Sequence, residues 1–300
     1  MSRTVKAHIL LVLTALVWGA TFVQIKDALR QASPLLFNAV RMSLAAIVLA
    51  IIYAPQLKRM NRAAFASGVM VGIFLCLGYE LQTTGLQYTT PAKSAFLTGL
   101  SVVLVPLFIA LLSRKPVRAW TVAGVLAALA GLYLLSVPQG QGSLLGDFQS
   151  VNRGDLLTMG CAISFTFQII FVGRASARHS FEAIAALQSA TAACLMIITA
   201  PILEQPHITW SVRVVAAILV TGLLGTAAAF TIQTWAQQFI SPTNTALIFA
   251  LEPVFAWLVS YLFLGERLGW RGAGGALLIL FGLLSSELLG KAGPVHAPEP

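Results

Sequence analysis

Charged side chains are scarce in this sequence. Asp, Glu, Lys and Arg make up only 10% of its 300 residues, whereas soluble domains carry about 25%. Apolar residues make up 58% of the chain. A chain of this length with so little charge would not fold as a water-soluble globule, so the sequence predicts an integral membrane protein in contact with the lipid bilayer.

Cysteine and histidine are also sparse, and their positions exclude several kinds of site. The three cysteines lie inside apolar runs without a CxxC motif or a histidine cluster, so we expect neither disulfides nor a metal site. The four histidines lie in loops or near chain ends and form no HExxH or Ser–His motif. Walker A and nucleotide-binding motifs are absent from the sequence. These absences disfavour an intramembrane enzyme and ATP-driven transport, and we expect no cofactor.

The net charge of +9 comes mostly from Lys and Arg in short loops between apolar runs. In such loops basic residues orient membrane helices, so we do not expect nucleic-acid binding. With the N-terminus inside, the inner segments hold 11 Lys and Arg residues and the outer segments hold 6. This bias predicts a multi-pass protein of the bacterial inner membrane with both termini in the cytoplasm.

Ten apolar runs are close to the length of about 20 residues that crosses a bilayer as a helix. They cover 7–25, 35–53, 65–86, 92–112, 119–137, 154–173, 182–203, 212–236, 243–264 and 270–289. The longest polar linker lies at the centre of the chain. We therefore predict two five-helix units, 1–138 and 154–290, with a linker at 139–153 and a disordered tail at 291–300.

One stretch of the chain occurs twice, at 79–94 and 230–245. A constant shift of 151 positions sets Gln82 on Gln233, and it also sets Thr83 on Thr234 and Pro91 on Pro242. Such a match indicates an internal duplication. Because each half has five helices, an odd number, the second half must enter the membrane upside down. The sequence thus predicts an all-α fold of two inverted five-helix repeats, an arrangement that recurs in secondary transporters.

Charged residues inside predicted spans are costly and must be explained, and four of them are candidates for a function. Arg41 and Glu80 lie at matching depths, so they could form an ion pair that fastens two helices, or serve the substrate or a gate. Lys93 also lies within a span. Glu252 directly precedes Pro253 and either couples a proton, lines a cavity or bonds backbone groups that the proline releases. Pro253 and Pro106 are candidate hinges and equally candidate static kinks.

Polar and aromatic residues in the spans suggest a cavity for a small organic molecule, built from helices 1, 3, 4, 6, 8 and 9. Each residue taken alone could instead tie helices together or face lipid. The candidates are Trp18, Tyr79, Gln82, Thr83, Phe96, Ser164, Phe165, Gln168, Phe230, Gln233, Thr234 and Phe249.

Glycines mark where two helices can approach closely. Gly124 and Gly131 in the fifth span are seven residues apart, and so are Gly275 and Gly282 in the tenth. This spacing returns to nearly the same face of a helix. We expect the fifth and tenth helices to form a packed structural pair.

The chain resembles the EamA-type branch of the drug/metabolite transporter superfamily. The resemblance covers about 7–290 and rests on Trp18-Gly19, on Pro34 with Phe37 and Arg41, on Pro91, and on the runs 251–255 and 265–267. The halves have diverged, because Gln188 stands where Arg41 would be repeated at a shift of 147. The resemblance implies a ten-helix inverted-repeat carrier of the inner membrane.

From this resemblance we expect a secondary transporter that exports small metabolites by alternating access, with amino acids as the preferred cargo. A multidrug exporter or an exporter of other metabolites with the same fold is the alternative within the family. An intramembrane enzyme and a channel are the alternatives from other classes. The oligomeric state is left open, and a monomer is compatible with the sequence.

Overall fold

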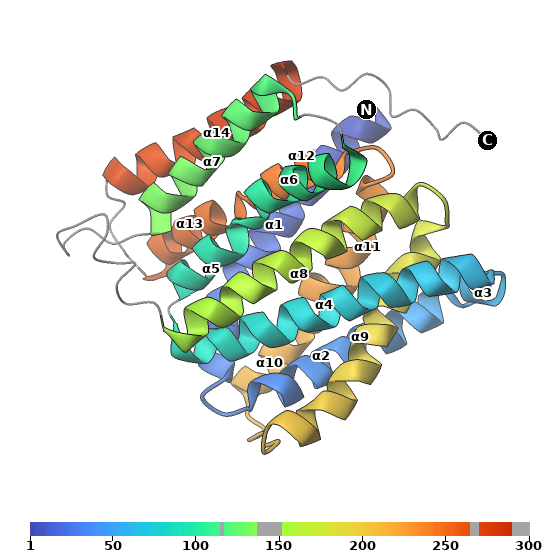
Figure 1. Ribbon diagram of the computed structural model, residues 1–300. Helices are drawn as coiled ribbons and strands as arrows, with labels where there is room; N and C mark the ends of the chain where they lie inside the picture. The colour runs from blue at the N-terminus through green and yellow to red at the C-terminus, as the bar shows by residue number, and fades with distance from the viewer. Residues whose placement is uncertain (90, 115–116, 137–151, 265–269, 290–300) are drawn as a thin grey trace.

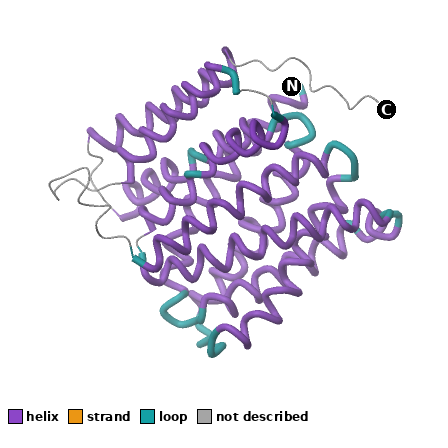
Figure 2. The backbone as a smooth tube through the Cα atoms, in the orientation of Figure 1, coloured by secondary structure: helices purple, strands orange, loops and turns teal. Residues whose placement is uncertain are grey.

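The computed structural model describes residues 1–89, 91–114, 117–136, 152–264 and 270–289. Helices form nearly all of this part of the chain (Figure 2). Within it, eight helices are long and apolar enough to cross a membrane, and two shorter apolar helices cover 119–134 and 270–286. The predicted linker up to 151 and the predicted tail lie outside the described residues.

The first repeat contains the first five spans. Its helices are α1 (Arg3–Ala28), α2 (Pro34–Ile52), the short α3 (Ala54–Lys58), α4 (Arg62–Tyr88), α5 (Pro91–Gly99), α6 (Ser101–Ser113) and α7 (Ala119–Ser136). The fourth span is divided between α5 and α6, whereas the sequence predicted one uninterrupted helix.

The second repeat follows the same order. Its helices are α8 (Arg153–Ser176), α9 (Phe181–Leu203), α10 (Val212–Leu219), the π-helix η1 (Val220–Ala228), α11 (Ala229–Ala236), α12 (Pro242–Phe249), α13 (Glu252–Leu264) and α14 (Trp270–Leu289). The eighth span is therefore three segments, α10, η1 and α11, in continuous succession. The ninth span is divided between α12 and α13.

Side-chain caps fix where several helices begin. Asn61, Ser180 and Ser241 each accept a hydrogen bond from a backbone N–H in the first turn of the helix that follows. Asn152 begins α8 with a capping box, because Asp155 returns a bond to the Asn152 N–H. Each cap satisfies a backbone donor that the helix itself leaves unpaired.

The predicted glycine pair joins α7 and α14, which lie side by side in Figure 1. A Cβ atom added to Gly124 would lie 2.5 Å from the Gly282 oxygen, and one added to Gly131 would lie 2.5 Å from the Gly275 oxygen. The early glycine of each helix meets the late glycine of the other, so the two helices are antiparallel. These helices are equivalent in the duplication, so their opposite directions confirm the inverted repeat.

Many large apolar side chains lie on the outside of the bundle. Ile51, Leu111 and Ile202 are among those that are 70% exposed or more. Soluble proteins rarely show such continuous apolar surfaces. Together with the helix lengths, this surface fits a multi-pass protein in lipid.

Two loops connect the repeats at one rim of the bundle. Ala32 and Ile208 form an antiparallel bridge, in which Ser33 N–H donates to the His207 oxygen at 2.9 Å. The Glu204 carboxylate also accepts the N–H groups of Leu35 and Leu36 at the start of α2. The α1–α2 loop is thus fastened to the α9–α10 loop by main-chain bonds.

Candidate functional site

A cavity lies between the two repeats and encloses about 770 Å³, its open mouth included. The first, third, fourth, sixth, eighth and ninth spans all contribute to its wall, as predicted, and α2 adds Arg41. The lining residues are Trp18, Thr21, Phe22, Ile25, Arg41, Tyr79, Gln82, Ala95, Thr98, Gly99, Ser101, Phe165, Gln168, Ile169, Thr221, Gly225, Phe230, Phe249, Glu252 and Pro253.

A chain of aromatic contacts forms much of the wall, and its members alternate between the repeats. The Trp18 ring lies 4.7 Å from Phe249 and 5.7 Å from Phe230, between centroids. Tyr79 lies edge-on to Phe230 at 6.0 Å and to Phe165 at 5.5 Å. Such tilted contacts favour aromatic packing and leave ring faces available to a ligand.

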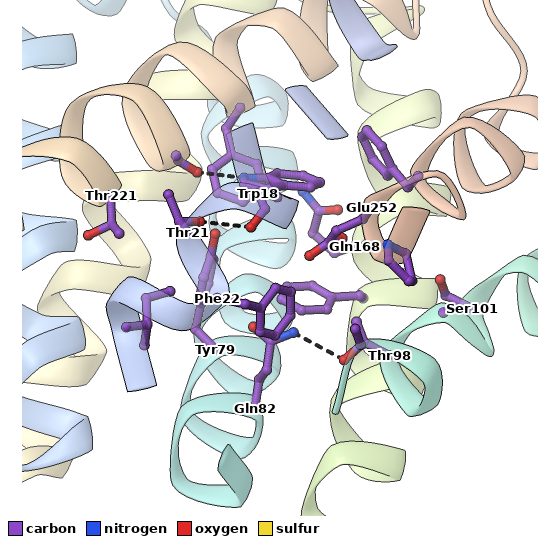
Figure 3. A pocket seen from close by; sticks show the side chains of 18 of the residues that line it. Trp18, Thr21, Phe22, Tyr79, Gln82, Thr98, Ser101, Gln168, Thr221 and Glu252 are labelled. Carbon is purple, nitrogen blue, oxygen red and sulfur yellow. Dashed lines mark hydrogen bonds between the residues drawn. The ribbon is translucent and has the colours of Figure 1, made fainter. Parts of the chain in front are cut away.

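Trp18 is held in place from the opposite repeat. Its Nε1–H donates to the Gly225 oxygen at 2.7 Å, and Gly225 lies within the π-helix η1. Short π-helical segments are rare and often lie at functional sites. The irregular eighth span thus provides the acceptor that orients the indole ring of Trp18 (Figure 3).

The fourth and ninth spans are interrupted at equivalent positions. The first break lies at Leu100 and the second at Ala250 and Leu251, and the shift of 151 sets Leu100 on Leu251. The second half-helices begin at Ser101 and Glu252, which both line the cavity. Pro106, the candidate hinge or kink of the first repeat, lies within α6 and not at the break. Pro253, the second residue of α13, lies at a break.

Glu252 is the acidic residue of the cavity wall. Its side chain is partly exposed and points toward the middle of the pocket, near Gln168, in Figure 3. Among the described residues it has no hydrogen-bond or ion-pair partner, so the predicted bonds to backbone groups near Pro253 are not formed there. Its carboxylate is therefore available to a ligand.

The predicted ion pair between Arg41 and Glu80 is not formed. The guanidinium of Arg41 lies over the Tyr79 ring, 4.2 Å from its centroid, while Glu80 accepts a hydrogen bond from Thr199. Depth alone suggested the pair. Successive residues of a helix point about 100° apart, so Tyr79 faces α2 whereas Glu80 faces α9.

Buried amides form a second polar group next to the cavity. Gln168 Nε2 donates to Gln188 Oε1 at 3.0 Å, Gln188 Nε2 donates to Thr234 Oγ1 at 3.1 Å, and Gln233 Nε2 donates to Gln168 Oε1 at 3.1 Å. Gln237, at the end of α11, accepts from Gln233. We call Gln168, Gln188, Gln233, Thr234 and Gln237 the amide cluster. Only Gln168 of this cluster reaches the cavity.

The cavity reaches only part of the way through the bundle. Ile25 in the last turn of α1 and Ala95 in α5 line it near one end. Gln168 lines its inner wall, and the amide cluster continues from there toward the other end of the bundle. The cluster is buried throughout, so it separates the cavity from that side.

Several predicted site residues lie away from the cavity. Thr83 donates to Asn38 Oδ1 at 3.2 Å, and Ser164 donates to the Gly160 oxygen at 3.0 Å. Phe96 packs against Tyr133. Thr83 and Phe96 thus connect helices, as the alternative interpretation held, whereas Ser164 bonds within its own helix α8. The Lys93 side chain lies outside the described part of the chain.

About half of the residues that line the cavity were not predicted from the sequence. Thr21, Phe22 and Ile25 follow Trp18 at helical spacing, a signal that was available. Thr98 and Ser101 flank the break at Leu100, and Thr98 accepts a hydrogen bond from Gln82 at 3.1 Å. Gly99, at the end of α5, directly precedes this break, and it was a signal that could have directed attention to the polar residues beside it.

Comparisons with known proteins agree with this architecture. The model of the EamA-like transporter family matches the chain twice, at residues 5–137 and 152–286. An uncharacterized transporter of Archaeoglobus fulgidus is 33% identical over 280 residues, which cover 93% of this chain and 84% of that protein. The uncharacterized transporter YoaV of Bacillus subtilis is 24% identical over 287 residues, which cover 93% of this chain and 96% of that protein.

The fold also occurs in a solved crystal structure. That structure superposes with a TM-score of 0.75 at 20% identity, over 95% of this chain and 97% of the other. At this identity the likeness concerns the fold alone. The sequence relatives are transporters by description, and the two family matches fall on the two repeats. The protein is therefore a membrane transporter, not an enzyme, and it belongs to the EamA-like transporter family.

Proposed function

We propose that the protein exports small metabolites, amino acids in preference, from the cytoplasm by alternating access. The observation that carries this proposal is a cavity lined by residues of both inverted repeats and closed toward one end by the amide cluster. A site of this kind reaches one side at a time, as a carrier requires and an open channel does not.

Amino acids suit the chemistry of the wall. Trp18, Phe22 and Phe165 offer apolar surface to side chains of different shapes, while Gln82 offers an amide at the wall. Mostly apolar walls with a few directed polar groups are typical of sites for small organic ligands. Glu252 adds a fixed acidic group that can interact with an ammonium.

The test is transport by the purified protein in lipid vesicles. We expect saturable uptake of radiolabelled amino acids and counterflow, in which unlabelled amino acid on the far side accelerates entry of the label. Saturable transport of amphipathic drugs without competition by any amino acid would favour the multidrug alternative. An ohmic current without counterflow would contradict the carrier mechanism.

A further inference from the structure

Two oppositely charged side chains belong to the cavity wall, and they differ in access. Arg41 is 2% exposed, and its Nε and Nη2 atoms are buried. The Tyr79 ring covers its guanidinium at 4.2 Å, and Phe37 approaches it at 5.6 Å. Glu252, in contrast, is partly exposed and points into the pocket. A ligand in the cavity therefore meets the negative charge before the positive one.

Helix packing brings aromatic rings to the same place as this carboxylate. A Cβ atom added to Gly19 would lie 2.5 Å from the main-chain oxygen of Glu252 and 2.8 Å from the main-chain nitrogen of Ala256. The α1 backbone therefore touches the beginning of α13, and Trp18 lies at this contact. Phe249, three residues before Glu252, packs against the Trp18 ring at 4.7 Å.

The local backbone also suits a negative charge at residue 252. Glu252 is the first residue of α13, and the N-terminus of a helix stabilises a nearby carboxylate through its dipole. Trp has the aromatic ring that attracts cations most strongly, and the attraction increases where water is excluded. A carboxylate that lines the same largely apolar cavity as Trp18 and Phe249 can bind an organic ammonium ion.

We propose that Glu252 binds the ammonium group of the cargo, with Trp18 and Phe249 as aromatic partners. The ligand class is a primary ammonium ion attached to an apolar or aromatic group. This inference rests on the proposed function in that amino acids belong to this class, and it deepens that proposal by naming the group that is recognised. Arg41 then supports the wall through Tyr79 and is not the first group to meet the cargo.

Three probes with the same phenyl ring separate the possible contacts. Phenethylamine carries only an ammonium, 3-phenylpropionate only a carboxylate, and L-phenylalanine both. A compound that binds the folded protein raises its unfolding temperature as the concentration rises. We expect phenethylamine and L-phenylalanine to raise this temperature for the full-length protein, and 3-phenylpropionate to have little effect.

Substitution of Glu252 tests the residue itself. Glu252→Gln removes a hydrogen bond to a charged group, so the Kd for phenethylamine should increase by about 10- to 100-fold. Glu252→Asp keeps the charge and should keep most of the affinity. Glu182→Gln is the matched control, because Glu182 lies in the first turn of α9 and does not line the cavity. It should bind phenethylamine as the wild type does.

A second variant keeps the test valid if Glu252→Gln does not fold. Trp18→Leu keeps the carboxylate and removes the aromatic face, so it should weaken phenethylamine binding by about 3- to 30-fold. The inference is overturned if no probe binds, if 3-phenylpropionate binds as tightly as phenethylamine, or if the folded Glu252→Gln variant binds phenethylamine at wild-type affinity.

The vesicle assay separates this inference from the proposed function. If phenethylamine binding depends on Glu252 but no amino acid shows counterflow, the ammonium site stands and amino-acid export fails. If amino acids show counterflow while Glu252→Gln binds phenethylamine unchanged, export stands and the ammonium site fails.

Discussion

The two repeats have the same succession of helices, but their equivalent polar groups differ in environment. In the first repeat Arg41 and Gln82 line the cavity. Their equivalents in the second repeat, Gln188 and Gln233, are fully buried and bonded within the amide cluster. Arg41 is itself buried beneath Tyr79, but Gln82 is partly exposed to the cavity whereas its equivalent Gln233 is not.

This difference suggests how an inverted repeat can change its accessible side. In an inverted pair, the two repeats face opposite sides of the membrane, and a rocking motion can exchange their environments. The first repeat would then close around Arg41 and Gln82, while the amide cluster would open. The two repeats differ in charge as well, because the neutral Ser101 stands where the second repeat has Glu252.

The largest expected effect concerns the direction of the repeats. Gln87 and Gln238 are equivalent at the shift of 151, and both are exposed. In a background without the exposed Cys194, Gln87→Cys should react almost only with reagent outside the cell, and Gln238→Cys almost only with reagent inside. Labelling in intact cells and in inverted vesicles measures this. Labelling of both from the same side would contradict the inverted arrangement.

The next prediction concerns the glycine contact between α7 and α14, which we call the seam. It tests whether the two repeats contribute equally to the seam, although they contribute unequally to the cavity. Gly131 and Gly282 are equivalent, and each approaches a backbone oxygen of the other helix. Leucine at either position should lower the free energy of unfolding by at least about 3 kcal/mol, because the side chain overpacks the contact. Denaturant unfolding in mild detergent measures the loss.

The control for the seam is Gly274→Ala, because a Cβ atom at Gly274 would meet no atom within 4 Å. It should change stability little. Unequal losses for Gly131→Leu and Gly282→Leu would show that the seam is not symmetric.

The two break positions allow a direct comparison of charge. If Glu252 binds the cargo, Glu252→Gln should lower kcat/KM for amino-acid transport by about 10- to 100-fold, which corresponds to the loss of a charged hydrogen bond. Ser101→Ala at the equivalent position should lower it by only about 2- to 5-fold, as expected for a neutral bond. Initial rates in vesicles measure both. Equal losses would contradict a special role for the charge.

The smallest effect concerns the amides of the two repeats. Gln188→Ala removes one buried hydrogen-bond partner from Gln168 and one from Thr234, which should cost about 1–3 kcal/mol of unfolding free energy. Gln82→Ala removes one bond to Thr98 at the cavity wall, so it should cost about 0.5–1 kcal/mol. Thermal unfolding compares the two. A greater loss of unfolding free energy for Gln82→Ala would contradict the conclusion that the amides of the second repeat are buried and those of the first are open to the cavity.

Much of the fold could be predicted from the sequence, because spans and duplication are properties of the chain itself. Apolar runs gave the segments, and the glycine interval gave the contact of α7 with α14. The partner of Glu80 could not be predicted, because Thr199 lies in a distant helix and depth does not specify direction. Gly99 lies directly before the break at Leu100, and Gly222 and Gly225 lie within η1, but a glycine in an apolar run does not specify which irregular conformation forms, since tertiary contacts decide it.

The candidate site was predictable in its aromatic part and less so in its polar part. Trp18, Tyr79 and Phe230 stand out as large side chains in spans, and all three line the cavity. Gln82 and Gln233 are identical in the sequence, yet only Gln82 lines the cavity. Sequence equivalence cannot distinguish them, because the difference arises from the state of each repeat.

The contact at Gly19 has a mechanical consequence. No side chain separates the α1 backbone from the beginning of α13. These two segments therefore pack directly against each other across the boundary between the repeats and should move together. The interruption at Ala250 and Leu251 provides a joint directly beside it. A displacement of α13 at this interruption should therefore displace α1, a helix of the other repeat, because no flexible side chain lies between them.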